Sequence, residues 1–167
     1  DSGNIWLMDN RDMDDIYEEM TAVDITKSKV FPGLFISCTT LKDPTSFDGK
    51  HHSLEVITYI NPDSFSKFNK EDKQRSQEYL EFKEILTCKM ITTLERALPG
   101  ISDHIVHKEL GTPITNKYYL NATNGSVYGT EKSFGQIGPF AFKAKSEIEN
   151  LYMCGASIQS HGVAGAS

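Results

Sequence analysis

Hydrophobic and polar positions along the chain predict three short strands in its first third. Residues 4–9 form a short apolar segment, and residues 34–39 are rich in β-forming side chains after a Pro-Gly turn. Residues 53–61 alternate apolar with mixed side chains, which is typical of a half-buried strand. A polar loop at 41–52 is too long for a tight hairpin, but antiparallel pairing of 34–39 with 53–61 is the simplest topology.

The helical pattern is clearest over residues 76–98, where apolar residues recur at spacings of three and four before Pro99-Gly100. Shorter helices are expected at 12–20, where Asp12 or Asp14 provides the N-cap, and from Pro113 to about residue 121. The remaining expected elements are a strand at 104–110, a glycine-containing loop at 122–139 and a terminal strand at 151–154. The predicted fold class is α+β, with a mainly antiparallel sheet packed by one long helix.

Composition narrows the classes of function. The 167 residues suffice for one domain with a core, and the net charge of −6 argues against a nucleic-acid surface. The chain has no apolar run of membrane-spanning length and begins with polar, acidic residues rather than a signal peptide, so a cytoplasmic location is expected. Cys38, Cys88 and Cys154 are widely spaced, which favours a reducing compartment and three small core residues.

The last residues carry the most informative chemistry. An apolar run, Leu151 to Cys154, stops at Gly155, and after a turn of small residues Gly162-Val-Ala-Gly165 opens a helix. A strand that passes through glycine into a helix start can hold an anionic cofactor, because backbone N–H groups approach it closely. The chain ends before that helix has made two turns, so we expect a piece of a larger protein.

Several sequence blocks resemble the phytoene desaturase and carotenoid isomerase family of FAD-dependent oxidoreductases. Those in the C-terminal half are Glu109-Leu-Gly-Thr-Pro-Ile-Thr-Asn116, Tyr128-Gly-Thr130, Gln136-Ile-Gly-Pro-Phe140, Leu151-Tyr-Met-Cys-Gly-Ala-Ser157 and His161-Gly-Val-Ala-Gly-Ala166. Leu41-Lys-Asp-Pro44 and His51-His-Ser-Leu-Glu55 extend the resemblance to the N-terminal half. The glycine-rich G-x-G-x-x-G motif with which members of this family begin does not occur here.

The resemblance implies a substrate-domain portion at residues 1–150 and a truncated FAD-contacting strand-turn-helix start at 151–167. It also implies that the chain alone is not catalytically competent. The residues implied to contact FAD in the full-length protein are Gly155, Ala156, Ser157, His161, Gly162, Val163 and Gly165. No catalytic residue is assigned. The alternatives are a tight turn at the glycines, helix capping by Ser157, and capping or packing by His161.

Two other groups of residues have competing interpretations. The aromatic side chains between residues 118 and 142 either pack in a core or form one wall of an apolar tunnel; they are Tyr118, Tyr119, Tyr128, Phe134, Phe140 and Phe142. His104 and His107 would lie on opposite faces of the expected strand, and no Cys or carboxylate cluster completes a site with them. No metal site is therefore predicted.

By family implication, the full-length protein acts on an apolar isoprenoid or polyene, by hydride transfer or by flavin-assisted isomerisation. Peripheral contact of that larger protein with a membrane is compatible with the resemblance, and the oligomeric state is left open. The alternative from another class is a non-catalytic lipid-binding domain without flavin. A third interpretation is an amine-oxidase-like flavoenzyme with a small polar substrate, which should line its cavity with charges or an aromatic cage.

Overall fold

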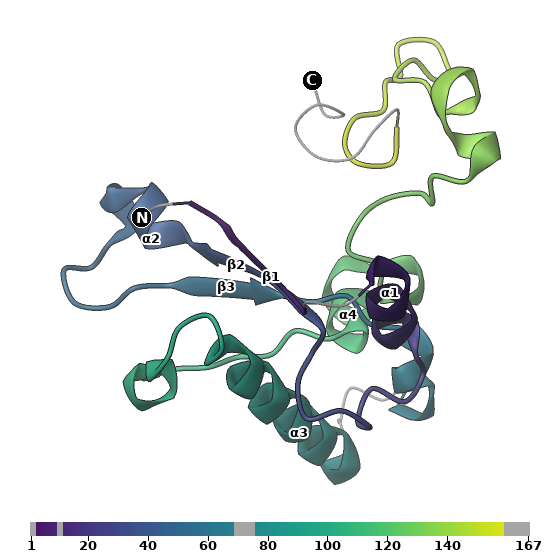
Figure 1. Cartoon of the computed structure of the whole chain (residues 1–167). Coiled ribbons are helices and arrows are strands. Elements are labelled where there is room, and N and C mark those ends of the chain that lie inside the picture. Colours follow the sequence, from purple (N-terminus) through teal and green to yellow (C-terminus); the bar gives the residue numbers. More distant parts are fainter. Residues whose placement is uncertain (1–2, 10–11, 69–75, 159–167) are drawn as a thin grey trace. The chain divides into compact units, whose positions relative to one another are not determined.

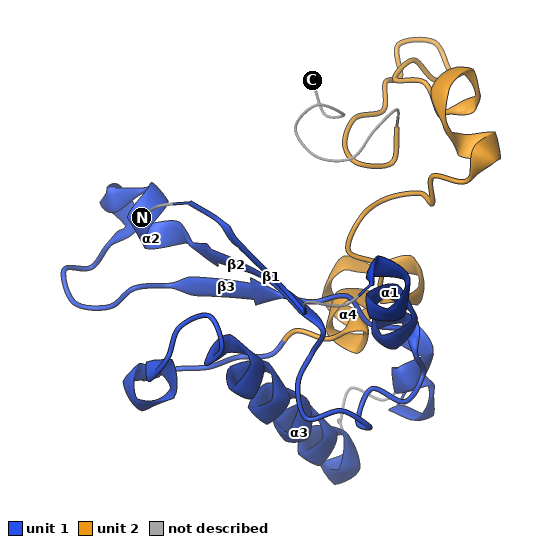
Figure 2. Ribbon diagram, in the orientation of Figure 1, with its two compact units in different colours: residues 1–110 blue, residues 111–167 orange. Residues whose placement is uncertain are grey.

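The structure is a computed structural model, and it describes residues 3–9, 12–68 and 76–158. The chain forms two compact units, residues 1–110 and residues 111–167 (Figures 1 and 2). The elements of the first unit are β1 (Ile5–Met8), α1 (Met13–Thr21), β2 (Gly33–Cys38), α2 (Thr39–Lys42), β3 (Leu54–Ile57) and α3 (Gln77–Leu94). The second unit contains α4 (Pro113–Leu120) and short 3₁₀ turns.

The three strands form one antiparallel sheet in the order β1-β2-β3 (Figure 1). Trp6, Phe35 and Ile57 are paired across the strands and therefore share one face, whereas Ile36 and Val56 are paired on the other. The three predicted strands and the pairing of β2 with β3 are confirmed. The structure is thus an α+β fold with a small antiparallel sheet.

The long helix is confirmed, although α3 ends at Leu94 rather than residue 98. Ser76 caps its N-terminus by accepting the N–H of Tyr79. Aromatic rings of the 3₁₀ segment Pro62–Phe68 hold its first half: the Phe68 and Tyr79 ring centroids are 5.5 Å apart, and those of Phe65 and Phe82 are 5.3 Å apart. This packing buries Tyr79 and Phe65 almost completely.

The core of the first unit extends beneath the second half of α3. Thr93, which is fully buried, accepts the N–H of Phe31 at 2.8 Å and donates its hydroxyl proton to the Lys89 carbonyl at 2.7 Å. The side chain therefore ties the extended segment before β2 to the helix. The buried hydrophobic residues of this unit are Ile16, Ile25, Phe31, Leu34, Ile36, Phe65, Phe68, Tyr79, Leu86 and Leu94.

Two expected strands are wrong. Residues 101–104 form a 3₁₀ helix, because the Glu95 carboxylate accepts the N–H groups of Gly100 and Ser102 and fixes a turn there. Residues 105–110, where the strand was expected, have no regular structure. Residues 151–154 form only one β-bridge, between Tyr152 and Lys145. The chain reverses at Asn150, whose φ of 62° is left-handed, between the two residues of this bridge.

The expectation that all three cysteines are small core residues is also wrong. Cys88 and Cys154 are exposed and Cys38 is half-buried. Cys88 lies on the outer face of α3, where its Sγ is 3.8 Å from Glu84 Oε1. Among the helices in the described ranges, none combines the length and apolar character needed to cross a membrane.

Candidate functional site

Residues 155–158 are the described part of the predicted flavin-contacting segment. They form a turn in which the Ile158 N–H donates to the Gly155 carbonyl at 3.3 Å. Gly155 has a φ of 101°, which only glycine adopts without strain. Ala156 and Ser157 follow within the turn. The other predicted contacts, His161, Gly162, Val163 and Gly165, lie outside the described residues.

The turn is docked onto an earlier part of the second unit. A Cβ atom at Gly129 would lie 2.5 Å from Ser157 Oγ and 2.6 Å from its backbone N, so only glycine permits this approach. The Thr130 hydroxyl donates to the Ser157 carbonyl at 3.1 Å, and the Lys132 ammonium donates to the Ile158 carbonyl. The structure therefore brings together two sequence blocks, around 128–130 and 151–157, that carry the family resemblance.

The geometry of Gly155 suits a ligand that approaches backbone. Among the described residues, no atom lies within 4 Å of the position that a Cβ would occupy there. Gly155 is half-buried, and the close contact at Gly129 anchors the turn. These features fit the glycine-lined edge that a flavin requires, and contact of Gly155, Ala156 and Ser157 with FAD stays a prediction.

The six aromatic side chains singled out in residues 118–142 are exposed, so their interpretation as core residues is wrong. Their exposed fractions run from 49% for Phe142 to 87% for Phe134. Tyr118 and Tyr119 contact each other edge to face, with ring centroids 4.8 Å apart. The region is made mostly of short 3₁₀ turns, and its other large apolar side chains, Leu120, Val127 and Ile137, are exposed as well. Only the interpretation as an uncovered wall or patch remains.

An apolar groove that the sequence pattern did not reveal lies in the first unit. Its volume is about 370 Å³, and we call it the methionine groove; its lining residues are Trp6, Met8, Met13, Ile16, Tyr17, Met20, Gly33, Leu34, Phe35, Ile57, Thr58 and Tyr59. The Trp6 ring meets Phe35 edge on, with centroids 4.8 Å apart. Trp6 and Tyr17 are 64% and 67% exposed, so the groove is open.

The local sequence explains how the methionine groove forms. Met13, Tyr17 and Met20 are spaced by four and three residues and therefore share one face of α1. Gly33 lets this face approach the sheet, because a Cβ there would lie 2.9 Å from Met8 Sδ and 3.2 Å from Met20 Cε. The stripe could have been read from the sequence. The packing of this stripe against the sheet could not, because it depends on the fold.

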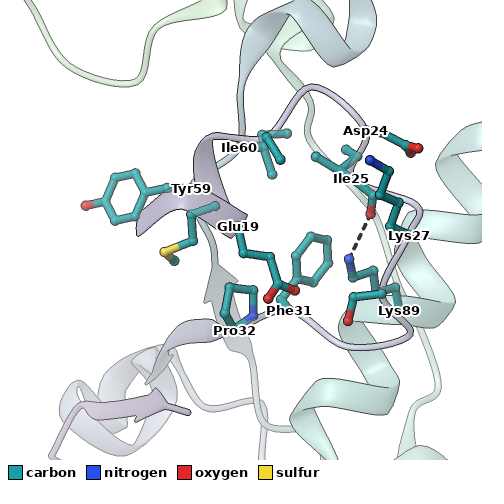
Figure 3. Close-up of a pocket in the computed structure, with 12 residues that line it drawn as sticks. Glu19, Asp24, Ile25, Lys27, Phe31, Pro32, Tyr59, Ile60 and Lys89 are labelled. Atoms are coloured by element: carbon teal, nitrogen blue, oxygen red, sulfur yellow. Dashed lines mark hydrogen bonds between the residues drawn. The ribbon is translucent and has the colours of Figure 1, made fainter. Parts of the chain in front are cut away.

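A second cavity, of about 330 Å³, contains a buried lysine (Figure 3). Lys89 Nζ donates to the Ile25 carbonyl at 2.7 Å and lies 4.4 Å from the centroid of the Phe31 ring. Burial lowers the pKa of Lys89, and the negative charges of Glu19 and Asp24 partly oppose this shift. Because the ammonium is bonded to a carbonyl of the 22–32 segment, its role here is to hold that segment against α3.

The described residues contain no group of three or more His, Cys, Asp or Glu side chains that could hold a metal ion. The expectation that His104 and His107 lie on opposite faces of a strand is wrong, because His104 ends a 3₁₀ helix and His107 lies in an irregular segment. His51 pairs with Asp48, with Nδ1 and Oδ2 2.9 Å apart. Thr40 Oγ1 is 2.9 Å from His52 Nδ1.

Curated proteins similar to this chain are reductases and isomerases. The chain is 28% identical to an all-trans-retinol 13,14-reductase of Danio rerio over 172 residues, which is 98% of this chain. It is 25% identical to the Homo sapiens reductase over 173 residues, and 32% identical over 132 residues to prolycopene isomerase 1 of an Oncidium hybrid cultivar. No protein-family model matches the chain, and no solved structure matches it significantly.

These similarities confirm the resemblance to the phytoene desaturase and carotenoid isomerase family of FAD-dependent oxidoreductases. The relationship to the retinol reductases covers almost the whole chain, and that to the isomerases covers 76% of it. The chain spans about 28% of the length of the reductases and 21% of the Oncidium isomerases.

Proposed function

We propose that this chain is part of an FAD-dependent oxidoreductase or isomerase whose substrate is an apolar polyene. The observation that carries the proposal is the methionine groove. It occurs in a chain that is related over most of its length to retinol reductases and prolycopene isomerases. The groove supplies aromatic faces and polarisable thioethers, both of which pack well against a conjugated hydrocarbon.

The lining of the methionine groove favours a polyene over a small polar substrate. None of the described side chains that line it carries a charge, and Thr58 and the two tyrosines are its only hydroxyl groups. The Thr58 hydroxyl donates to the Gly33 carbonyl at 2.9 Å. An amine-oxidase-like enzyme would need carboxylates or a closed aromatic cage for a cation, and the open, uncharged groove offers no carboxylate.

The second half of the proposal concerns the terminal segment. When bound, FAD supplies hydride transfer to or from a carbon of the polyene. In the full-length protein, Gly155, Ala156 and Ser157 would offer backbone to the flavin. The sequence after them, with His161, Gly162, Val163 and Gly165, would offer the N–H groups of a helix start. The residues of this chain would bind the flavin and the polyene, orient them relative to each other and exclude water.

A non-catalytic lipid-binding domain is the rival function, since the methionine groove alone would serve it. The anchored turn at Gly155 favours the flavoenzyme, because a lipid-binding domain has no use for a left-handed glycine turn fixed against residues 129–132. Reduction, desaturation and isomerisation of the polyene share this architecture. The relatives include both reductases and isomerases, so the proposed reaction is a redox reaction or an isomerisation of the polyene.

The single tryptophan provides a direct test of the methionine groove. Trp6 is the only tryptophan of the chain and lines the groove, so a bound polyene should quench its fluorescence by energy transfer. All-trans-retinol added to the chain is expected to quench Trp6 in a saturable manner. Tyr17→Glu, which places a charge in the groove, should weaken this binding at least about tenfold, the equivalent of ~1.4 kcal/mol.

The matched control is Ile85→Glu, which places the same charge on an exposed apolar position of α3 outside the groove. Ile85 is 54% exposed and Tyr17 is 67% exposed in α1. The control should bind retinol as the original chain does. Absence of quenching in the original chain, or equal weakening by both substitutions, would remove the methionine groove from the account.

A further inference from the structure

A third cavity of the first unit is larger than the methionine groove and differs from it in chemistry. Its volume is about 710 Å³, within the usual range for small-molecule sites, and residues from β3, α3, the loop before β3 and the segment after α3 line it. Four of the five histidines of the chain line this cavity: His51, His52, His104 and His107. We call it the histidine groove.

The floor of the histidine groove is apolar and only partly covered. Leu54 and Val56 come from β3, Met90 and Ile91 from α3, and Ile105 from the segment that follows. All five side chains are half-buried, so each still has surface that an apolar ligand could cover. Val56 points to the sheet face opposite Ile57, which places the histidine and methionine grooves on opposite faces of the sheet.

The rim contains two carboxylates, and both have cationic or N–H partners. Asp48 accepts the N–H groups of Lys50 and His51, and the His51 contacts hold the pKa of this carboxyl far below its usual range. Glu109 Oε1 is 3.2 Å from Lys83 Nζ. The one lysine in the lining, Lys108, is paired with Glu84 at 2.7 Å.

Histidine protonation would therefore reverse the charge of the rim. With neutral histidines, one lysine and two carboxylates give the lining side chains a formal charge of −1, and four protonated imidazoles would change it to +3. The lining residues from α3 and β3 include no titratable group, so no further charge faces the histidines from the floor. Histidine is the side chain that changes charge between pH 5 and 8.

We propose that the histidine groove binds an amphiphile with an apolar chain and an anionic head, and that this binding tightens as the pH falls. The apolar floor covers the chain, and the protonated rim attracts the head group. His52 is fixed for such a role, because it stacks on Phe47 with centroids 4.5 Å apart and its Nδ1 lies against Thr40. This site is separate from the flavin segment and from the methionine groove.

Calorimetric titration of the 167-residue chain with dodecanoate, below its micelle concentration, tests the proposal. Affinity at about pH 5.5 should exceed that at about pH 7.5 by about tenfold, since several weak charge contacts are gained together. Dodecanol, which has the same chain and a neutral head, should bind with no such pH dependence. Equal affinity of dodecanoate at both pH values, or no binding at either, would overturn the proposal.

Two variants separate the head-group contacts from the floor. His104→Gln/His107→Gln should reduce the pH ratio for dodecanoate to about threefold, because half of the rim charge is lost. Met90→Gln should weaken binding at both pH values equally and leave the ratio unchanged. Lys67→Gln, which removes an exposed charge outside the groove, should change neither quantity.

Retention of the full pH ratio by the double histidine variant would contradict the assignment to this groove, as would a Met90→Gln chain that binds as the original does. Circular dichroism of each variant establishes that it is folded. Trp6 lies on the opposite sheet face, so the double histidine variant should leave the quenching of Trp6 by retinol unchanged, and the two proposals fail or hold separately.

Discussion

At the scale of single residues, Lys89 shows how a charge is kept inside the first unit. Its side chain is 8% exposed and directs its ammonium at the Ile25 carbonyl and the Phe31 ring. Loss of water around the ammonium lowers its pKa, so the charged form is less favourable in the folded chain than in the unfolded one. Packing and one hydrogen bond stabilise the buried group.

Lys89 therefore gives a pH dependence of known sign. Between its lowered pKa and the ordinary value of 10.5, the unfolded chain holds a proton that the folded chain has released. Folding is then favoured as the pH rises through that window. The thermal midpoint of the original chain, measured relative to Lys89→Met, should be higher at about pH 9.5 than at about pH 7.

The control for this comparison is a lysine whose side chain is exposed to solvent. Lys67 is exposed and paired with Glu78 at 2.9 Å, so Lys67→Met serves as the control and should show no such change over the same pH range. A thermal midpoint of the original chain that falls relative to that of Lys89→Met as the pH rises would show that the charged form is stabilised by folding, against this account.

At the scale of elements, the periodicity of the sequence predicts the helices and strands. Segments whose conformation depends on contacts between elements could not be predicted in this way. The strands at residues 5–8, 33–38 and 54–57 and helix α3 follow directly from period and composition. The 3₁₀ helix at Ile101–His104 depends on the Glu95 carboxylate, which comes from the turn after α3 and has no signature in the local pattern.

The candidate sites follow the same division. Glycines and small residues marked the segment from Gly155 onward, because backbone approach to a ligand restricts residue type. The methionine groove was missed although Met13, Tyr17 and Met20 recur at helical spacing. A stripe of this kind shows which face of a helix is apolar, but only the fold shows that the face stays partly uncovered.

Gly129 provides a test at the scale of the terminal turn. Gly129→Ala would place a methyl group 2.6 Å from the Ser157 backbone, so residues 153–158 should detach from 128–132. Hydrogen exchange at the amides of Met153 and Ile158, which donate to Ala144 and Gly155, should accelerate at least about tenfold.

Gly135→Ala is the matched control for this substitution. No atom in the described part of the chain lies within 4 Å of a Cβ at Gly135, and its φ is one that alanine accepts, so exchange in residues 153–158 should stay unchanged. Slow exchange in Gly129→Ala would mean that the turn at Gly155 is held by something other than its contact with Gly129.

At the scale of the whole molecule, the chain provides two separate units with complementary chemistry. Residues 1–110 contain both apolar grooves, and residues 111–167 contain the anchored glycine turn. The chain spans 28% of the Danio reductase, so an enzyme of that length has room for the nucleotide-binding motif that is missing here. The central claim is that the full-length protein holds a flavin against the segment that begins at Gly155.

The visible absorption spectrum of that full-length protein, purified without added cofactor, tests the claim most directly. The account predicts flavin absorbance in the original protein and in Gly135→Asp, and its loss in Gly162→Asp, because a carboxylate at the helix start predicted there would repel the anionic cofactor. The two variants differ only in where the charge is placed. A colourless original protein, or a Gly162→Asp variant with full flavin absorbance, would contradict it.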